Sequence, residues 1–351
     1  MKRGLSLCLA LVCLLGCFVS LTGCGKKKTK YTDYSFDFFD TVTTIIGYEA
    51  NANDFAKNCV IIKEELKKYH RLYDIYNTYS NMNNLYTINQ VVDGAHVEVE
   101  VDEKIISLLE YAKEMYTLTD GRVNVAMGAV LSIWHRYRTQ GMDEPSKATL
   151  PPETALNAAR EHTNIDDLII NAEKNTVYLA DPKMTLDVGA IAKGYAVEMV
   201  AQLMEDLGMT GYILNVGGNV RTIGTRPDGT PWHVGIESPD EESDAYITHL
   251  KISDMSLVTS GSYQRYYIVD GVAYHHIIDP DTLMPGNRYL SVSILCQRSG
   301  YADALSTALF NMPLEAGQAL IESLENVEAQ WVLPDGSIQT SSGFSAYTFT
   351  P

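Results

Sequence analysis

The chain is poor in cysteine. Six of its 351 residues are cysteines, and four of these lie within the first 24 positions. Only Cys59 and Cys296 follow, which is too few for a fold held together by several disulfides. Their separation along the chain neither supports nor excludes one bridge between them. We therefore expect a hydrophobic core to stabilise the fold, and 351 residues are enough to build one.

Basic residues are also scarce. The sequence has 27 Lys and Arg against 44 Asp and Glu, a formal net charge of −17. It offers no extended basic face to a phosphate backbone, which argues against nucleic acid as a partner. A hydrophobic content of 46% with 20% charged residues is typical of a globular protein rather than a disordered one. Repeats, low-complexity tracts and linkers are missing from residues 35–351, so we expect one domain there.

The N-terminus has a long apolar run, residues 5–21, preceded by Lys2 and Arg3. A basic start, a short apolar segment and small residues before a cleavage point are typical of a secretory signal. The run is at the short end for a membrane-spanning helix. Its end, Leu21-Thr22-Gly23-Cys24, resembles the lipobox of bacterial lipoproteins, in which this cysteine becomes the lipidated N-terminus.

Three regions follow from this pattern. Residues 1–23 are predicted to be a lipoprotein signal peptide, and residues 24–34 a lipidated cysteine with a basic tether. The lysines between positions 26 and 30 suit a surface of anionic lipid head groups. Residues 35–351 would be the folded domain. We expect it on the extracytoplasmic face of a bacterial cell membrane, anchored through lipid on Cys24.

Helical and strand patterns alternate irregularly along the domain. Apolar periodicity predicts helices at residues 54–73, 103–118, 128–137, 195–204, 301–310 and 314–323, with another from about 153. Strands are predicted at residues 34–49, 97–101, 168–170, 176–179, 212–216, 232–236, 247–252, 256–259, 265–269, 273–278, 329–333 and 337–340. Residues 77–89 and 141–152 are predicted to be surface loops. Without regular βαβ alternation, this pattern predicts an α+β fold with largely antiparallel sheets and flanking helices.

A candidate anion site lies where a turn at residues 186–191 leads into a helix with Lys193 at its start. Free backbone N–H groups at a helix start, with a lysine, suit phosphates. Asp187 adds an acceptor for a hydroxyl, a ring N–H or metal-bound water. The spacing is neither a dinucleotide fingerprint nor a P-loop, and the alternative is a helix start with a solvated lysine.

His275 and His276 are adjacent in a predicted strand, so their side chains point to opposite faces. We expect His275 on the outer face. His276 shares a face with Tyr274 and Ile278, where an imidazole without a partner would be costly. A ligand, a substrate or a carboxylate would then accompany His276.

Asp303 and Thr307 are four residues apart in a predicted helix, and therefore share a face. A carboxylate with a hydroxyl is part of an oxygen-ligand site for Mg²⁺, which usually keeps waters and substrate phosphates as well. The alternative is structural: Asp303 caps the helix and Thr307 bonds back to a carbonyl. Gly217-Gly218 follows a predicted strand, and a tight turn is enough to explain these two glycines.

Together these segments resemble the ApbE family of FAD:protein FMN transferases. Five matches occur in the family's order, at residues 187–195, 217–219, 259–263, 276–280 and 302–308. The resemblance implies a single ApbE-like, T-fold-related domain. It also implies an extracytoplasmic enzyme that splits FAD with the help of Mg²⁺. FMN would pass through a phosphoester bond to a Thr or Ser hydroxyl of a target protein, with release of AMP. The partners would be FAD and flavin-acceptor proteins of extracytoplasmic electron transfer.

The resemblance also implies roles for particular residues. His276 matches the histidine that activates the acceptor hydroxyl. Ala190, through its backbone oxygen, and Asp303 and Thr307 match the metal ligands. Positions matching cofactor contacts are Phe39, Tyr79, Arg122, Val123, Asn124, Asp187, Lys193, His276 and Ile277. Independently, attack on a diphosphate needs positive charge at the phosphates, which Mg²⁺ and Lys193 would supply.

The sequence departs from the family pattern at two informative positions. Asn124 stands where the family usually has Asp, which removes a charge, and Leu283 stands where it usually has Gly. Two rival functions use the same residues: a Mg²⁺-dependent FAD pyrophosphatase, and a flavin-binding lipoprotein without activity. A hydrolase using Ser260 is disfavoured, because Ser260 is not in a Gly-x-Ser-x-Gly elbow.

Overall fold

The computed structural model describes residues 27–240, 245–263 and 265–351. The predicted signal peptide and Cys24 lie outside these ranges, so the structure does not bear on them. Within the described ranges, no helix has both the length and the apolar character needed to cross a membrane. Cys59 and Cys296 are both buried and form no disulfide.

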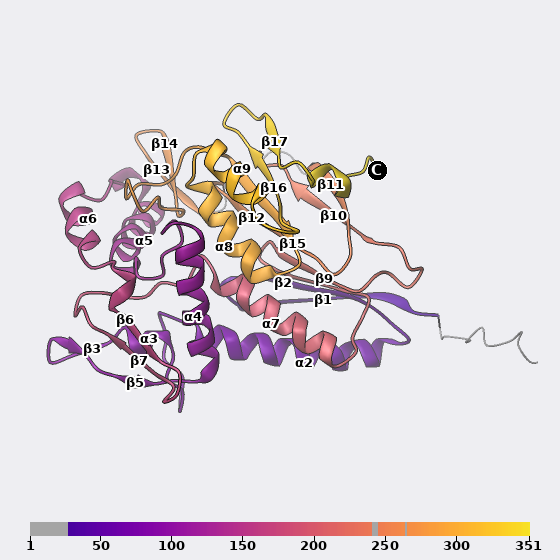
Figure 1. Ribbon diagram of the computed structural model, residues 1–351, viewed down its shortest axis with the longest axis horizontal. Coiled ribbons are helices and arrows are strands. Elements are labelled where there is room, and N and C mark those ends of the chain that lie inside the picture. Colours follow the sequence, from indigo (N-terminus) through magenta and orange to yellow (C-terminus); the bar gives the residue numbers. More distant parts are fainter. Residues whose placement is uncertain (1–26, 241–244, 264) are drawn as a thin grey trace, which may run out of the picture.

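The fold is built on an eight-stranded sheet in which every neighbouring pair is antiparallel (Figure 1). Its strands, in spatial order, are β1 (Thr29–Phe38), β2 (Thr41–Glu49), β8 (Tyr212–Val216), β9 (Asn219–Ile223), β12 (Ser256–Gly261), β15 (Ser291–Cys296), β16 (Glu328–Val332) and β17 (Ile338–Thr340). The α+β class with antiparallel sheets is confirmed.

Helices cover one face of this sheet (Figure 1): α2 (Ala52–Leu72), α7 (Ala192–Asp206), α8 (Ser299–Phe310) and α9 (Leu314–Glu322). Helix α2 begins at Asn51, whose side chain accepts the backbone N–H groups of Asn53 and Asp54. Its apolar residues recur at helical spacing and are buried in the main core, as are Ile45 on β2 and Val197 on α7.

The opposite face is covered in part by a ribbon of β10 (Trp232–Glu237) and β11 (Tyr246–Ile252). Leu257 on β12 and Leu295 on β15 point into this second core, whereas their neighbours Val258 and Ile294 point into the main core. Because both faces are covered, all six residues of β15 are buried.

The remaining elements lie largely at one end of the molecule (Figure 1). Those at residues 128–160 and 266–275 surround a third core, whereas those at residues 85–118 and 168–179 bury most of their apolar side chains in the main core. Trp134, Leu156, Tyr267 and Leu283 belong to the third core. The elements are α3 (Leu85–Ile88), β3 (Val91–Val92), β4 (Ala95–His96), β5 (Val99–Glu100), α4 (Glu103–Leu118), α5 (Gly128–Asp143), α6 (Glu153–Arg160), β6 (Leu168–Asn171), β7 (Thr176–Leu179), β13 (Tyr266–Val269) and β14 (Val272–His275), while short 3₁₀ turns span Pro145–Lys147, Ile165–Asp167 and Phe344–Tyr347.

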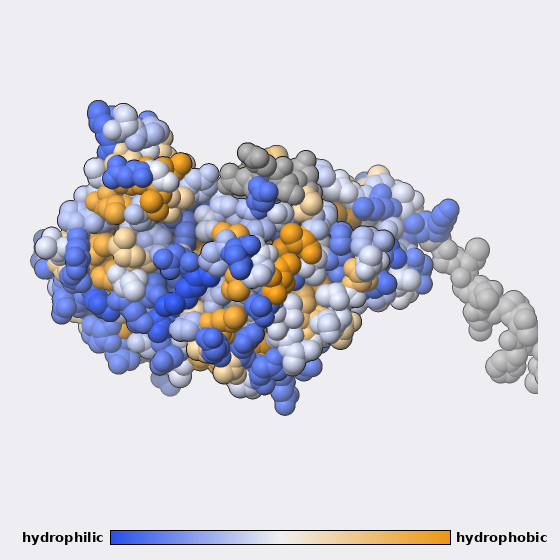
Figure 2. Space-filling view, turned by 90° about the horizontal axis from the view of Figure 1, so that it is seen from above, coloured by the Kyte–Doolittle hydropathy of each residue, from blue (hydrophilic) through white to orange (hydrophobic). Residues whose placement is uncertain are grey.

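The face that includes β13, β14 and β17 is mainly hydrophilic with several separate apolar patches (Figure 2). Exposed apolar side chains on these hairpins include Ile268, Val272 and Ile338. Single exposed apolar residues of this kind are normal on a folded domain.

Two N-terminal predictions were wrong. Residues 34–49 form two strands joined at Phe39 and Asp40, whose φ values of 54° and 51° define a tight hairpin turn. The sequence has no glycine or asparagine there to mark the turn. Strand β1 also begins at Thr29, so residues 29–34 belong to the folded domain rather than to the tether.

Three further boundaries differ from the prediction. Residues 77–89 are not wholly a surface loop, because the short helix α3 buries Leu85 and Ile88. Its capping box pairs Asn84 with Thr87, a signal that the polar composition concealed. In the predicted strand at 97–101 only two residues pair, and α5 continues six residues beyond the predicted end at Tyr137.

Candidate active site

Asp303 lies inside helix α8, which begins at Ser299, so it does not cap the helix. Its side chain is almost fully buried, and Oδ2 accepts the backbone N–H of Gly194 at 2.8 Å, near the start of α7. Lys193 Nζ is 4.0 Å from Asp303 Oδ1. A Cβ atom at position 194 would lie 2.3 Å from the Asp303 Cβ, so only glycine permits this approach.

Burial raises the pKa of Asp303, while Lys193, the Gly194 N–H and Asn219 act in the opposite direction. Asn219, at the start of β9, has a buried Oδ1 with no hydrogen-bond partner in the described structure. Buried acceptors of this kind need a donor or a cation. The surroundings of Asp303 therefore favour a positively charged ligand.

The three predicted metal ligands come from two segments that meet here. Ala190 precedes α7 by two residues, and Thr307 lies one turn beyond Asp303 on α8; both are half-buried. A carboxylate, a hydroxyl and a carbonyl form an all-oxygen donor set that fits Mg²⁺ with waters and phosphates completing the shell. No cluster of three or more His, Cys, Asp or Glu capable of holding a metal occurs in the described residues.

Asp187 lies in the turn before α7. Its backbone N–H is donated to the Val125 carbonyl at 2.8 Å, and its Oδ1 accepts the Gly189 N–H at 2.8 Å. Burial raises the pKa of Asp187. The hydrogen bond from the Gly189 N–H and the charges of His135 and Arg138 on α5 act to lower it, but burial is the larger effect. The carboxylate is therefore held by its own turn and faces α5.

His276 follows directly after β14. Its Nδ1 is buried and makes no hydrogen bond to any described residue. Burial lowers the pKa of His276 to about 3, together with the positive charges of Arg138, Arg265 and Lys193. The imidazole is therefore neutral near pH 7 and has a nitrogen free to interact with a ligand.

The prediction for His275 was wrong. It is buried rather than on the outer face; its Nε2 is hydrogen-bonded to the Gly286 carbonyl, and its ring packs edge-on against Phe310. Strand β14 ends at His275, so the strand alternation used in the prediction does not extend to His276.

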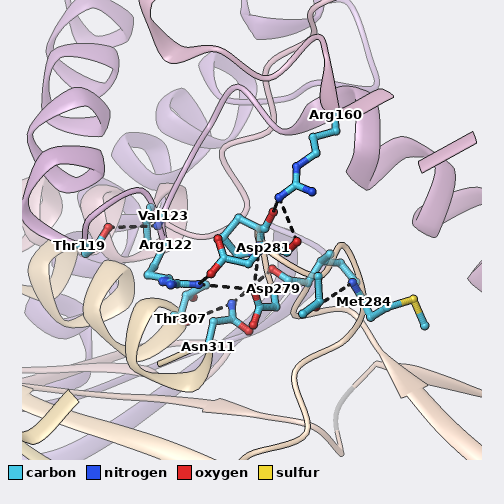
Figure 3. A network of polar contacts seen from close by, with 12 residues as sticks. Thr119, Arg122, Val123, Arg160, Asp279, Asp281, Met284, Thr307 and Asn311 are labelled. Carbon is cyan, nitrogen blue, oxygen red and sulfur yellow. Dashed lines mark hydrogen bonds and ion pairs between the residues drawn. The ribbon is translucent and has the colours of Figure 1, made fainter. Parts of the chain in front are cut away.

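The loop that carries His276 is held by side chains from three other segments (Figure 3). Arg122 forms ion pairs with Asp281 and, at 3.5 Å, with Asp279. Arg160 donates to the Asp281 carbonyl at 2.9 Å, and Trp134 Nε1 donates to the Leu283 carbonyl at 2.8 Å. The predicted cofactor residue Arg122 thus has its guanidinium directed at this loop.

The two residues after Arg122 also make contacts within the fold. Val123 is buried, and its N–H is donated to Thr119 Oγ1 at 3.1 Å. Asn124 donates to the Thr163 carbonyl at 2.9 Å and accepts the Ala126 N–H at 2.9 Å. An ionised aspartate could accept the second bond but could not donate the first, so asparagine suits this position. Ile277, next to His276, is buried.

Phe39 and Tyr79, the predicted flavin neighbours, lie near the end of α2. Phe39 is at the tip of the β1–β2 hairpin, where its N–H is donated to His70 Nδ1 at 3.2 Å. Tyr79 donates its hydroxyl to Asp74 at 2.7 Å, and the Arg71 guanidinium lies 5.3 Å from its ring centre.

Four residues near the site were missed by sequence reasoning: Tyr76, His135, Arg138 and Arg265. The exposed Tyr76 ring lies 5.4 Å from the His135 ring, and Arg138 Nη2 is 3.2 Å from His135 Nδ1. Arg265 donates to the Asp40 carbonyl at 3.3 Å. A tyrosine close to Tyr79 was the available signal, because Arg138 lies within α5 and Arg265 just before β13, neither in a motif that the sequence analysis used.

Positive charges surround His276, and burial opposes the ionisation of the two site carboxylates Asp187 and Asp303. A site of this kind suits an anionic, phosphorylated substrate. The class of protein that it defines is an enzyme of phosphate-ester or diphosphate chemistry.

Comparison with known proteins specifies the family. The model of the ApbE family matches residues 39–331. An FAD:protein FMN transferase of Treponema pallidum (strain Nichols) is 34% identical over 259 residues, covering 70% of each chain. Another, of Haemophilus influenzae, is 29% identical over 336 residues, covering 93% of this chain and 91% of the other. The chain therefore belongs to the ApbE family, as the sequence resemblance predicted.

Solved structures agree with this assignment. The crystal structure of the ApbE protein from Thermotoga maritima has a TM-score of 0.79 at 29% identity, covering 92% of this chain and 100% of that chain. The flavin transferase ApbE from Vibrio cholerae has a TM-score of 0.74 at 27% identity, covering 91% and 100%. The shared fold includes nearly all of the described residues.

Proposed function

We propose that this chain transfers FMN from FAD to a Thr or Ser hydroxyl of an acceptor protein. The product is a phosphoester, and AMP is released. The observation that carries the proposal is His276, a neutral imidazole with an unpartnered buried nitrogen, whose pKa responds to Lys193 as well as to two arginines. A base beside groups that neutralise phosphate is what this transfer requires.

The transfer forms one phosphorus–oxygen bond and breaks another. The acceptor hydroxyl oxygen attacks the phosphorus of the FMN half, and the bond from this phosphorus to the AMP oxygen breaks. His276 takes the hydroxyl proton, and AMP leaves with the bonding electron pair. Lys193 and the N–H groups at the start of α7 offset the negative charge of the phosphates. His276 therefore acts on the acceptor, and Lys193 acts on the dinucleotide.

The Ala190 carbonyl, Asp303 and Thr307 would hold Mg²⁺. When bound, this ion would add positive charge at the diphosphate and at the leaving group. The buried Asp303 carboxylate and the partnerless Asn219 oxygen support a cation at this position.

One experiment separates the rival functions. Residues 27–351 are incubated with FAD, Mg²⁺ and a flavin-acceptor protein, then assayed for in-gel flavin fluorescence and for AMP. A fluorescent acceptor band with AMP supports transfer. AMP and free FMN without a band, with an acceptor that a known transferase modifies, would indicate the pyrophosphatase. Neither product would indicate a flavin-binding protein without activity.

For the cellular setting, we propose attachment through lipid on Cys24 to the extracytoplasmic face of a bacterial membrane. The support is the basic, apolar and small-residue pattern that precedes Cys24, and the lysines that follow it. Acceptors would then be proteins of extracytoplasmic electron transfer.

A further inference from the structure

Arg138 and Arg265 come from elements that pack tightly against each other. Arg138 lies on α5, and Arg265 directly precedes β13. The contact between these elements is close at Gly141, where an added Cβ atom would lie 2.4 Å from the Tyr267 ring. Positions 138 and 141 are neighbours on one helical face, and Arg265 is two residues from Tyr267, at the entry to β13. Both arginines thus lie at the same junction.

Neither arginine forms an ion pair with an acid that the structure describes. In the described part of the chain, no carboxylate oxygen lies within 4.0 Å of Arg138 or Arg265, although Arg122, Arg221 and Arg298 each form such a pair. Arg138 instead contacts a histidine nitrogen, His135 Nδ1, and Arg265 donates to a backbone carbonyl, that of Asp40.

The pairing of two like charges is unfavourable without a counter-ion. Burial and the charge of Arg265 both lower the pKa of Arg138. Asp187 is near enough to oppose this effect but forms no ion pair with Arg138, and burial raises its own pKa. An oxyanion between the guanidinium groups would offset the repulsion and accept charge-assisted hydrogen bonds from both.

The position of His276 indicates which oxyanion this is. Arg138 and Arg265 are, after burial, the two largest influences on His276. In the proposed function, which this inference deepens, His276 activates a hydroxyl that attacks phosphorus. The attacked phosphate must therefore lie beside His276, in reach of the same arginines. We propose that Arg138 and Arg265 form a two-arginine clamp for the diphosphate of the dinucleotide substrate.

The test compares two flavins that differ in phosphate. Riboflavin shares the isoalloxazine ring of FAD but has no phosphate. Binding of each to Arg138→Gln and Arg265→Gln is measured by flavin fluorescence, with Mg²⁺ and without acceptor. Arg136→Gln is the matched control, because Arg136 is an exposed arginine on the same helix, 5.6 Å from the Tyr137 ring centre.

The clamp predicts that each variant binds FAD roughly tenfold or more weakly, whereas riboflavin binding and the control are unchanged. Arg138→Lys and Arg265→Lys should recover part of the lost FAD affinity, because lysine keeps the positive charge but lacks the two parallel N–H donors of the guanidinium group. Unchanged FAD binding, or equal weakening of FAD and riboflavin, would overturn the proposal. Arg265 is exposed, so Arg265→Gln decides the outcome if Arg138→Gln fails to fold.

A second measurement keeps the clamp separate from the proposed function. Inorganic pyrophosphate should displace FAD from the parent protein and from Arg136→Gln, and displace it less effectively from the clamp variants. Arginine-dependent FAD binding without AMP or flavinylated acceptor would refute the transferase and retain the clamp. Transfer at the parent rate by both clamp variants would refute the clamp and retain the transferase.

Discussion

Burial shifts the acids and the histidine of the site in the same chemical direction, toward their neutral forms. The pKa values of Asp187 and Asp303 are raised, and that of His276 is lowered. Without substrate, the site therefore carries charges that the fold stabilises poorly. A dinucleotide with a cation would supply the missing counter-charges, so we interpret the residues as being arranged for a ligand.

Asp303→Ala should reduce turnover by about a hundredfold or more, because the only buried carboxylate of the Mg²⁺ donor set is removed. The measurement is AMP release from FAD with saturating Mg²⁺. Asp335→Ala, which changes an exposed acid in a turn, is the control for loss of charge. Turnover by Asp303→Ala at the parent rate would show that Asp303 is not a metal ligand.

His276→Ala should abolish transfer of FMN while FAD remains bound, because the side chain acts on the acceptor hydroxyl. Transfer is followed by in-gel fluorescence, and binding by the change in flavin emission. Loss of FAD binding in proportion to activity would instead assign His276 to substrate binding.

His276 should also affect the pH dependence of stability in the ligand-free protein. Its pKa is about 3 when folded and about 6.5 when unfolded, so the unfolded state binds more protons between these values. Protonation of this imidazole in the unfolded state therefore lowers the free energy of unfolding as pH falls from about 6.5 toward 3. Above about pH 6.5 it makes no such contribution. We expect the Tm difference between pH 7.5 and pH 5 to be smaller in His276→Gln than in the parent. An equal or larger difference would contradict the lowered pKa.

Among the secondary-structure elements, the contact between α7 and α8 positions the site. Gly194 and Asp303 are 109 residues apart in sequence but are joined by a hydrogen bond and by close packing. In the loop after β14, Leu283 has a left-handed backbone conformation, with a φ of 60°. That conformation costs about 1 kcal/mol for leucine, and its buried side chain offsets the cost by packing in the Trp134 core.

Gly194→Ala should destabilise the protein by roughly 1–3 kcal/mol and lower turnover, because the new methyl group overlaps Asp303 and the Ser299 carbonyl. Chemical denaturation and AMP release measure the two effects. Gly300→Ala is the comparison within the same helix pair, where the nearest atom, at 3.1 Å, is the end of the flexible Glu198 side chain. Similar losses in both variants would mean that the approach at Gly194 has no special role.

Strongly periodic elements were predictable, because their signal comes from residues within one or two turns. Helices α2 and α4, and hairpin β6–β7, were predicted close to their observed ends. The β1–β2 turn, α3 and the end of β14 were not. In these segments hairpin pairing, a side-chain cap or packing against Phe310 decides the conformation, and the polar or β-branched composition does not show these contacts.

For the whole molecule, the N-terminal pattern predicts that Cys24→Ala releases the protein from the membrane without changing its chemistry. The basic, apolar and small-residue pattern before Cys24 is the ground for expecting lipid on this cysteine to provide the attachment. Membrane fractionation with and without the substitution measures attachment, and AMP release measures activity. Retention of the variant in the membrane fraction would indicate an uncleaved N-terminal segment instead.

Sequence alone determined the family, the α+β class and the acidic, globular character of the chain. It also identified Asp187, Lys193, His276, Asp303 and Thr307 as candidates, because side-chain chemistry and order along the chain are properties of the sequence. Tertiary structure decided which of them meet, that His275 is buried, and that Arg138 and Arg265 lie at the junction between α5 and β13. These outcomes depend on packing between distant segments, which no local pattern encodes.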